Sequence, residues 1–469
     1  MVLGAGVAGL LAARVLSEFY ATVTVVERDA LPLSAEQRKG APQGRHLHNF
    51  LSSGTQVLGE LFPGILDELA SAGAVVDDSD DLSRVYARFG SREVKPAGRL
   101  RDPAPLAAYQ ASRPFMEFHI RRRVAALENV TLLDNHDVAG PVIDGGTITG
   151  VQIINCATGI ATSLDARLVV DATGRASRTQ HFLEDHGFGA TEENRVPPTG
   201  GYSSQLLRIA PGRITERMAF VNQGNIAPGA LLVAYEHDTW MLAVVRPIES
   251  GAPPGDFDEM MEVCGRLLPA TIMAGLRDAD PVGPISISRS TDAAWRRYDR
   301  NLDQPTGLIV IGDALCYLNP LHGQGMTMAA LQAVALRDCL QAGEATLPRR
   351  FYRAAAKCIG PVWAMNRAND QPPSLDASRT VRHRARVWTQ HAVVNAAAAD
   401  IGVYERVLRV RNLIDPPERL QDPRLFARIV LANLRHPRLK PQSATNLSHS
   451  RPLSGAALRY PDGRADHFT

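Results

Sequence analysis

The stretch Gly4-Ala5-Gly6-Val7-Ala8-Gly9 decides the fold of this chain, because apolar residues precede it and a helical pattern follows it. Apolar residues recur at helix spacing between residues 10 and 19, and residues 23–26 predict a strand that ends at Glu27. Strand, glycine turn, helix, strand and acid is the order of a dinucleotide-binding fold. We therefore predict an α/β chain that begins with a Rossmann-like unit.

Each glycine of this turn has its own role in such a fold. Gly4 permits the tight turn, Gly6 lets the backbone approach a pyrophosphate, and Gly9 lets helix and strand pack closely. The free N–H groups and the positive dipole end of the helix then face the phosphates. Glu27 follows at about the spacing expected for an acid that accepts hydrogen bonds from ribose hydroxyls.

Two later stretches extend this unit. Residues 169–175 (VVDATGR) form a short strand followed by a turn, and Gly312-Asp313 ends the apolar run 308–311. Asp313 at a strand's carboxyl end is placed to accept from flavin ribityl hydroxyls. Gly323 to Met326 offers N–H groups at the start of a helix through residue 340, which suits the negative edge of a reduced flavin. Together the stretches predict one FAD site, although each alone is also typical of an ordinary turn between a strand and a helix.

Two basic segments favour FAD over NAD. Residues 38–48 form a basic loop broken by glycine and proline, where a plain NAD domain would continue with βαβ units. Such a loop places cationic donors along a second phosphate and the flavin ring. The alternative interpretation is a solvated surface loop. Arg113, between a Ser cap and Pro114, starts a helix and could reach the phosphates or serve only as a surface residue. A metal site from His46, His48 and His322 is disfavoured, because no acid or cysteine cluster completes it.

Composition excludes several classes of partner. The chain has 469 residues, 45% hydrophobic and 21% charged, with a net charge of +2, which predicts no strong attraction to nucleic acid or acidic lipid. No apolar run approaches the roughly 20 residues that span a bilayer, and the start lacks the features of a signal peptide. Five scattered cysteines predict reduced thiols and a cytoplasmic protein.

We expect five regions along the chain. Alternating apolar residues after position 200 predict antiparallel strands at 202–209, 230–235 and 240–245, and either a pocket wall or a plain sandwich face. The later part is helical and rich in arginine, mostly solvated, with a membrane-binding amphipathic helix as a further option. The expected regions are an FAD-binding domain at 1–199 and 291–340, a substrate-binding β-sheet domain at 200–290, a C-terminal helical lobe at 341–440, and a disordered tail at 441–469.

These motifs resemble those of the FAD-dependent monooxygenases of the aromatic-hydroxylase and squalene-epoxidase type. Residues 38–48, 288–291 and 297–300 are also similar to actinobacterial epoxidases that oxidise polyene precursors of polyethers. With gaps, the resemblance runs from Met1 to about residue 435. The predicted FAD-contacting residues are Gly4, Gly6, Val7, Ala8, Gly9, Glu27, Arg28, Arg38, Arg45, His46, Arg113, Val138, Asp171, Gly174, Gly312, Asp313, Pro320, Gly323, Gln324, Gly325 and Met326.

The resemblance implies an activity. Reduced FAD reacts with O2 to give a C4a-hydroperoxide, which inserts one oxygen atom into a lipophilic, natural-product-like substrate by epoxidation or hydroxylation. The cofactor supplies the difficult chemistry, so the protein need not provide a nucleophile or a triad, and we predict no metal. We assign no residue as general acid or base; His322 and Gln324 are the polar side chains nearest the expected ring position. Many relatives have Asp-Gly where this chain has Thr173-Gly174, and that pair helps to bind the nicotinamide cofactor. Electrons therefore come either from NAD(P)H directly or from a separate flavin reductase.

Other functions remain open at this point. Some flavoproteins of similar sequence keep FAD as a structural part and cyclise a polyene without redox change. A non-catalytic flavin-binding partner protein is a third possibility, against which the intact loops at both flavin ends argue. A flavin halogenase is disfavoured, because none of the four tryptophans lies in a Trp-x-Trp-x-Ile-Pro segment.

Overall fold

A parallel sheet forms the centre of the first part of the molecule. The computed structural model describes residues 1–224, 227–301, 303–370 and 381–435, without the side chains of 381–387. The five strands of this sheet are all parallel and lie in the order β19-β11-β1-β2-β7. They are β1 (Val2–Leu3), β2 (Val23–Val26), β7 (Val130–Leu133), β11 (Val169–Asp171) and β19 (Leu308–Val310). The chain thus has the predicted Rossmann-like sheet.

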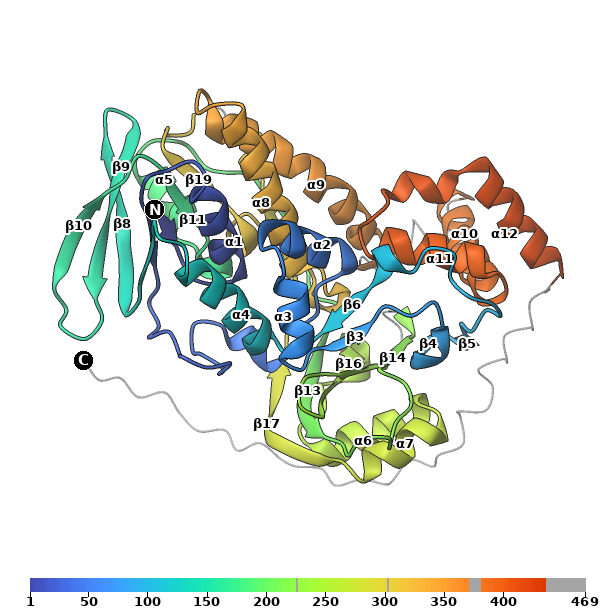
Figure 1. Ribbon diagram of the computed structural model, residues 1–469. Helices are drawn as coiled ribbons and strands as arrows, with labels where there is room; N and C mark the ends of the chain where they lie inside the picture. The colour runs from blue at the N-terminus through green and yellow to red at the C-terminus, as the bar shows by residue number, and fades with distance from the viewer. Residues whose placement is uncertain (225–226, 302, 371–380, 436–469) are drawn as a thin grey trace, which may run out of the picture. The chain divides into compact units, whose positions relative to one another are not determined.

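Helices cover this sheet, and their apolar faces form the largest core (Figure 1). Helix α1 (Val7–Leu16) contacts both α4 (Arg113–Ala125) and α8 (Gly325–Gln341). Most of α1 is buried, because Leu10, Leu11 and Leu16 point into this core. The neighbouring helices are α2 (Ser52–Leu61), α3 (Ile65–Ser71), α5 (Thr179–Asp185) and α9 (Leu347–Asp370).

Three smaller sheets lie beside this layer. The strands β8 (His136–Asp144), β9 (Thr147–Asn155) and β10 (Ala161–Asp165) form an antiparallel meander at the left of Figure 1. In the other two sheets, β3 (Val75–Asp77) pairs with β6 (Ala108–Gln110), and β18 (Ala293–Arg296) lies between β12 (Glu193–Val196) and β20 (Cys316–Tyr317).

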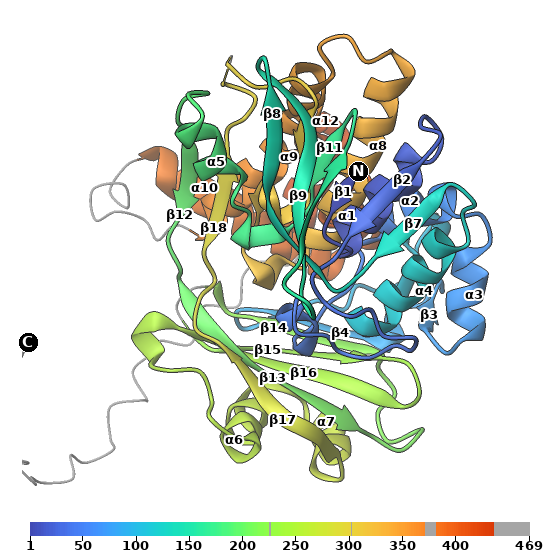
Figure 2. The same ribbon diagram turned by 90° about the vertical axis from the view of Figure 1, so that its left-hand side faces the viewer.

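A seven-stranded sheet forms the second part, in the order β17-β13-β16-β15-β14-β4-β5. Its alternate residues Leu207, Leu232 and Leu242 pack on α6 (Phe257–Leu267) and α7 (Ala270–Arg277). In Figure 2 these two helices lie on the side of the sheet away from the parallel sheet. The strands are β4 (Val85–Phe89), β5 (Arg92–Glu93), β13 (Gly200–Arg208), β14 (Met218–Asn222), β15 (Gly229–Ala234), β16 (Thr239–Pro247) and β17 (Asp280–Ser288).

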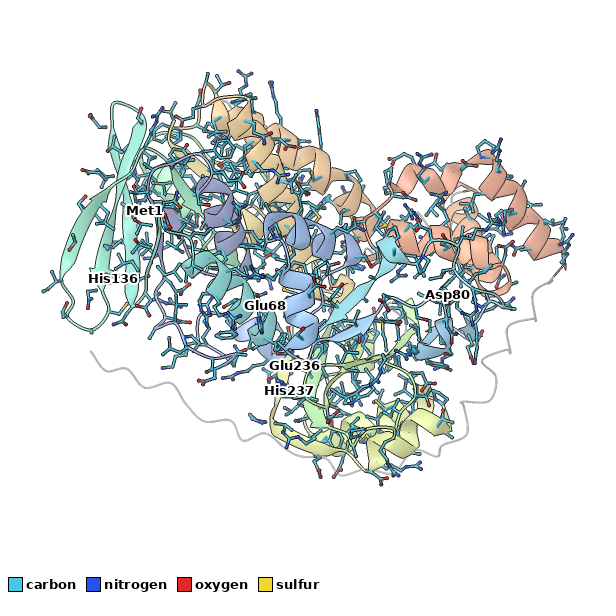
Figure 3. The ribbon with its side chains drawn as sticks, in the orientation of Figure 1. Met1, Glu68, Asp80, His136, Glu236 and His237 are labelled. Carbon is cyan, nitrogen blue, oxygen red and sulfur yellow. The ribbon has the colours of Figure 1, made fainter. Side chains whose placement is uncertain are left out.

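This sheet extends beyond the region 200–290 that the sequence indicates. Strands β4 and β5 come from residues 85–93, and β4 pairs in parallel with β14. The hydrogen bonds of this pairing link residues more than a hundred positions apart, so local alternation does not reveal them. Glu236 in the β15–β16 turn (labelled with His237 in Figure 3) accepts from the Ser112 backbone N–H at 2.8 Å, so it fixes this sheet to the start of α4.

The helices after residue 340 divide between two cores. Phe351 and Ile359 of α9 belong to the core of the parallel sheet. The helices α10 (Val381–Ala399), α11 (Ile401–Arg411) and α12 (Pro423–Arg435) instead pack with Ala87 of β4 and with Val94, the residue after β5. The predicted disordered tail at 441–469 lies outside the described residues. Within the described ranges, none of the helices has the length and apolar character to cross a membrane.

Candidate cofactor site

The three motifs meet at the carboxyl ends of β1, β11 and β19. A Cβ atom added to Gly4 would lie 2.8 Å from the carbonyl oxygen of Ala172, so the first turn lies against the second motif. A Cβ atom added to Gly312 would lie 2.6 Å from the Cβ of Ala8, so the third motif also contacts the first. Carboxyl ends of neighbouring parallel strands share one edge, which is where such sheets bind ligands.

The glycine turn leaves room for a phosphate. Gly9 packs so closely that an added Cβ would lie 1.8 Å from the carbonyl oxygen of Gly4. Gly6 differs, because an added Cβ would meet only the guanidinium groups of Arg113 and Arg38, at 3.9 and 4.0 Å. No side chain caps α1 at Gly6, so the helix start is open. An uncapped helix start beneath two guanidinium groups fits a pyrophosphate.

Carboxylates surround Arg38 at the nucleotide end. Its Nε donates to Glu117 at 2.6 Å, and its Nη1 lies 3.2 Å from Glu27 and 3.3 Å from Asp29. Burial alone would lower the pKa of Arg38, but these carboxylates, Glu117 foremost, raise it. The predicted phosphate donor is therefore held by pairing within the protein, and Glu117 is a member of the site that the sequence analysis missed. The alternation of Arg113, Glu117 and Arg121 at helix spacing was the available signal.

The carboxylate of Glu27 already accepts hydrogen bonds within the protein. It accepts from the backbone N–H of Ala5 at 2.7 Å and of Asp29 at 3.0 Å, and its side chain is buried. Each carboxylate oxygen has further lone pairs. The residue is thus placed beside the glycine turn, as the spacing predicts, with capacity left for a ribose hydroxyl.

Arg113 has free donor capacity. Its Nη2 lies 3.6 Å from Glu117, and its buried Nε has no hydrogen-bond partner in the described part of the chain. Burial lowers the pKa of Arg113, and Glu117 and Asp313 oppose this shift. Ser112 caps the helix by accepting from the Phe115 N–H at 3.3 Å, as the sequence indicates. Arg113 therefore lies between the glycine turn and the third motif.

Asp313 marks the flavin end. Its carboxylate accepts no hydrogen bond from the described residues, and an added Cβ on Gly325 would lie 3.9 Å from its Oδ1. Burial raises the pKa of Asp313, against the lowering effects of Arg113, Arg175 and Arg296. A half-buried acid without a donor among the described residues fits a ligand that brings hydroxyl groups. The residues of both ends therefore fit FAD.

The loop before α8 is held by α9 and by the start of α2. Gln324 accepts from the Nδ2 of Asn366 at 2.6 Å, and the Nε2 of His322 lies 2.9 Å from Asp370. Gly323 has φ +64°, and the next helix turn carries Thr327, which accepts from the Leu51 N–H at 2.9 Å. These contacts engage the two polar side chains nearest the predicted ring position. The backbone from Gly323 to Met326 remains the part of this loop that suits a flavin.

Several predicted contacts lie apart from this group. Arg28 and Arg45 are exposed, and neither side chain makes a hydrogen bond or ion pair with another described residue. Val138 is half-buried in β8 and pairs with Ile153 of β9. Asp171 is buried and accepts from Thr173, Ser177 and Thr179, so it shapes its own turn, in which Gly174 has φ +80°. The role of these residues in FAD binding stays a prediction.

The histidines of the basic loop dock on the large sheet. His46 Nδ1 lies 2.9 Å from Ser204 Oγ of β13, and burial lowers its pKa to about 4. The His48 backbone N–H and carbonyl both bond to the hydroxyl of Tyr235, at 2.8 and 2.6 Å. Ser204 and Tyr235 had no signal in the sequence, because cross-strand register decides which side chains meet the loop.

The fold of this chain is similar to that of solved flavin-dependent enzymes. The solved p-nitrophenol 4-monooxygenase PnpA of Pseudomonas putida DLL-E4 has a TM-score of 0.64 at 16% identity, covering 89% of this chain and 98% of that one. The flavin-dependent brominase Bmp2 has a TM-score of 0.62 at 15% identity, covering 93% and 98%. The chain therefore has the fold of flavin-dependent monooxygenases and halogenases, which confirms the predicted fold class.

Sequence identity is higher to a curated protein than to these two solved structures. Protein Rv3254 of Mycobacterium tuberculosis (strain ATCC 25618 / H37Rv) is 34% identical over 451 residues, which are 93% of this chain and 94% of that protein. The chain belongs to the same family as Protein Rv3254. Kynurenine 3-monooxygenase of Salinispora arenicola (strain CNS-205) is 27% identical over 363 residues, 73% of this chain and 72% of that enzyme. No protein-family model matches the sequence.

Proposed function

We propose that this protein is an FAD-dependent monooxygenase that inserts one oxygen atom from O2 into an apolar organic substrate. The meeting of Gly4, Ala172 and Gly312 at one sheet edge carries the proposal. The fold of the solved neighbours and the similarity to kynurenine 3-monooxygenase support an FAD-dependent oxidoreductase. Bound FAD supplies the activation of O2, which amino-acid side chains do not provide.

In this proposal the protein's residues hold FAD, orient it and shield it from water. The turn at Gly4, Gly6 and Gly9 and the open start of α1 bind the pyrophosphate, and Glu27 accepts from the ribose. Arg113 neutralises phosphate charge through its free donors. Asp313 accepts from the ribityl hydroxyls, and the N–H groups from Gly323 to Met326 stabilise negative charge on the ring.

The large sheet forms the substrate side. The face of this sheet that is turned away from α6 and α7 carries Leu206, Met218 and Met241, which pack with Leu47 of the basic loop. An apolar wall excludes water and suits a lipophilic substrate. Epoxidation of an alkene is the finer reading, in line with the resemblance of residues 38–48 to polyene epoxidases. We further propose a cytoplasmic enzyme with reduced thiols, and a separate flavin reductase as electron source, because Thr173 replaces the usual acid.

The decisive experiment uses Gly6, because a side chain there fills the phosphate space without striking the protein. The Gly6→Ala variant keeps an allowed φ of −73° and should fold like the wild type. Its FAD occupancy should fall at least tenfold, measured by flavin absorbance and by mass spectrometry of the released nucleotide. Gly140→Ala is the matched control, since no atom lies within 4 Å of its added Cβ. Full FAD retention by Gly6→Ala, or no FAD uptake by the wild type, would contradict the site.

The reaction is tested with isotopes. FAD-loaded protein, reduced under anaerobic conditions and mixed with 18O2 and a panel of alkenes and phenols, should give product that carries one 18O atom. Product formed from oxidised protein without oxygen would instead identify a redox-neutral cyclase.

A further inference from the structure

Arg411, the last residue of α11, is a cation without a counter-charge. It has no carboxylate or other hydrogen-bond partner in the described part of the chain, although its side chain is exposed. Its neighbours differ, since Arg406 and Arg409 both pair with Asp415, and Arg428 pairs with Asp400. Among the described residues, Arg411 therefore lacks the paired acid that these three arginines have.

Two phenylalanines lie beneath the guanidinium group of Arg411. Its Cζ is 5.3 Å from the ring centre of Phe89 and 5.5 Å from that of Phe220, and the two rings are 5.3 Å apart. Protein atoms around the group desolvate it and lower the pKa of Arg411. A cation above aromatic rings is a suitable place for an acid attached to an apolar body.

The phenylalanines lie on the same sheet face as the basic loop. Phe220 is opposite Leu231, Leu231 is opposite Ala243, and Ala243 is opposite Ser204, which contacts His46. This row crosses β14, β15, β16 and β13, so its ends are about 14 Å apart at the usual strand spacing. Phe220 and Leu231 are half-buried, whereas Ala219 and Leu232 on the other face are fully buried. Ala243 and Ser204, at the other end of the row, are buried. The face between Arg411 and His46 is therefore apolar for most of its length, and it is partly exposed in the half next to Arg411.

The end of α11 is also connected to the flavin end of the site. Asn412, next to Arg411, accepts from the Ser52 N–H at 3.2 Å and from its Oγ at 3.0 Å. Leu51, the preceding residue, donates to Thr327 in the first turn of α8. In Figure 1, α11 accordingly lies beside β4 and near α2. These bonds fix Arg411 relative to the loop that suits the flavin ring.

We propose that Arg411 binds a carboxylate of the substrate, whose apolar body lies over Phe89, Phe220 and the row that leads towards His46. The inference rests on the proposed function and specifies its substrate class as an apolar organic acid. A planar guanidinium donates two parallel hydrogen bonds to a carboxylate, which fixes the orientation of the acid. The remote acid would then set which carbon of the apolar body reaches the cofactor.

The test compares acids with their uncharged amides. FAD-loaded protein is titrated with 2-naphthoate, cinnamate, 4-phenylbutyrate and decanoate, and with the four corresponding amides, by flavin absorbance and by calorimetry. We expect at least one acid to bind at least tenfold more tightly than its amide. Arg411→Gln should abolish this preference without changing amide binding, and Arg411→Lys should retain part of it. Arg419→Gln is the matched control, because this exposed arginine of the same lobe has no acid partner among the described residues.

Three results would overturn the inference: no binding of any acid, equal binding of acid and amide, or an unchanged preference in Arg411→Gln. Calorimetry detects acid binding whether or not FAD is bound. Loss of the acid preference in protein that holds FAD therefore rejects only the role of Arg411, whereas failure to bind FAD rejects the proposed function.

Discussion

The nucleotide end and the flavin end of the site differ in whether their charged side chains are compensated within the protein. At the nucleotide end, Arg38 is surrounded by Glu117, Glu27 and Asp29, so its charge is already compensated within the protein. At the flavin end, the carboxylate of Asp313 has no donor among the described residues, and in the helical lobe Arg411 likewise has no acceptor among them. The first arrangement stabilises the fold, whereas the second costs stability and is useful when a ligand completes it.

This difference separates two kinds of charged residue near one cofactor. A buried ion-pair network positions the backbone turn and its removal harms folding first. An open charge does not stabilise the fold, and its removal harms ligand binding first. Replacing a residue of the first kind should therefore lower stability, and replacing one of the second kind should weaken ligand binding.

The largest effect is expected from Arg38→Met. Removing the cation leaves two buried carboxylates, Glu27 and Glu117, and the half-buried Asp29 close together, which should cost about 3–5 kcal/mol of unfolding free energy. Urea unfolding with and without added FAD measures this loss. Arg411→Gln is the control and should change stability by less than about 0.5 kcal/mol. Similar stabilities for the two variants would remove the distinction between paired and open charges.

A somewhat smaller loss is expected from Gly9→Ala. Its added Cβ would lie 1.8 Å from the carbonyl oxygen of Gly4, a backbone atom that cannot move freely. We expect a loss of about 1–3 kcal/mol by thermal and urea unfolding, together with loss of FAD. The control is Gly265→Ala in α6, where no atom lies within 4 Å, which should be neutral or stabilising by up to about 1 kcal/mol. A stable, FAD-binding Gly9→Ala protein contradicts the close packing of this turn.

Asp313→Asn tests the flavin end, where stability and binding should move in opposite directions. The folded-state pKa of Asp313 is raised by burial, so its ionisation destabilises the fold as the pH rises above the unfolded value of 3.8. The amide removes this cost, and the FAD-free variant should be at least as stable as the wild type at pH 7. Its affinity for FAD should fall about tenfold, or about 1.4 kcal/mol, by fluorescence titration. Lower stability of the FAD-free variant would place Asp313 with the structural charges.

The smallest effect is expected from His46→Gln. Burial lowers the pKa of His46 from 6.5 to about 4, so unfolding takes up a proton across this range and stability falls as the pH drops below 6.5. Glutamine does not titrate and should reduce this loss by about 1 kcal/mol between pH 6.5 and 5.5. Urea unfolding at a series of pH values measures the slope. An unchanged slope would show that the contact of His46 with Ser204 does not desolvate the ring.

The sequence indicated the nucleotide end well because its parts are consecutive. Strand β1, the glycine turn, α1 and β2 all lie within the first 27 residues, and their order is the fold signature. The start of α4 at Arg113 and the motif at Gly312 were also predictable, because a cap and a strand end are local features. The pairing of Arg38 with Glu117 was not predictable, since it joins residues 79 positions apart.

The large sheet shows the same limit. Apolar alternation predicted its central strands, but not the addition of β4 or the position of Arg411 over Phe89 and Phe220. Likewise, nothing local distinguishes Arg45, which is exposed and has no partner in the described ranges, from Arg38 in the same loop.

The sequence by itself determined the fold class and the cofactor class, because glycine conformations, hydrophobic periods and strand ends are properties of neighbouring residues. The tertiary structure alone decided which charges neutralise one another and which stay open to a ligand. The physical reason is that Coulomb interactions and desolvation depend on distances in space, which chain folding sets between residues far apart in the sequence.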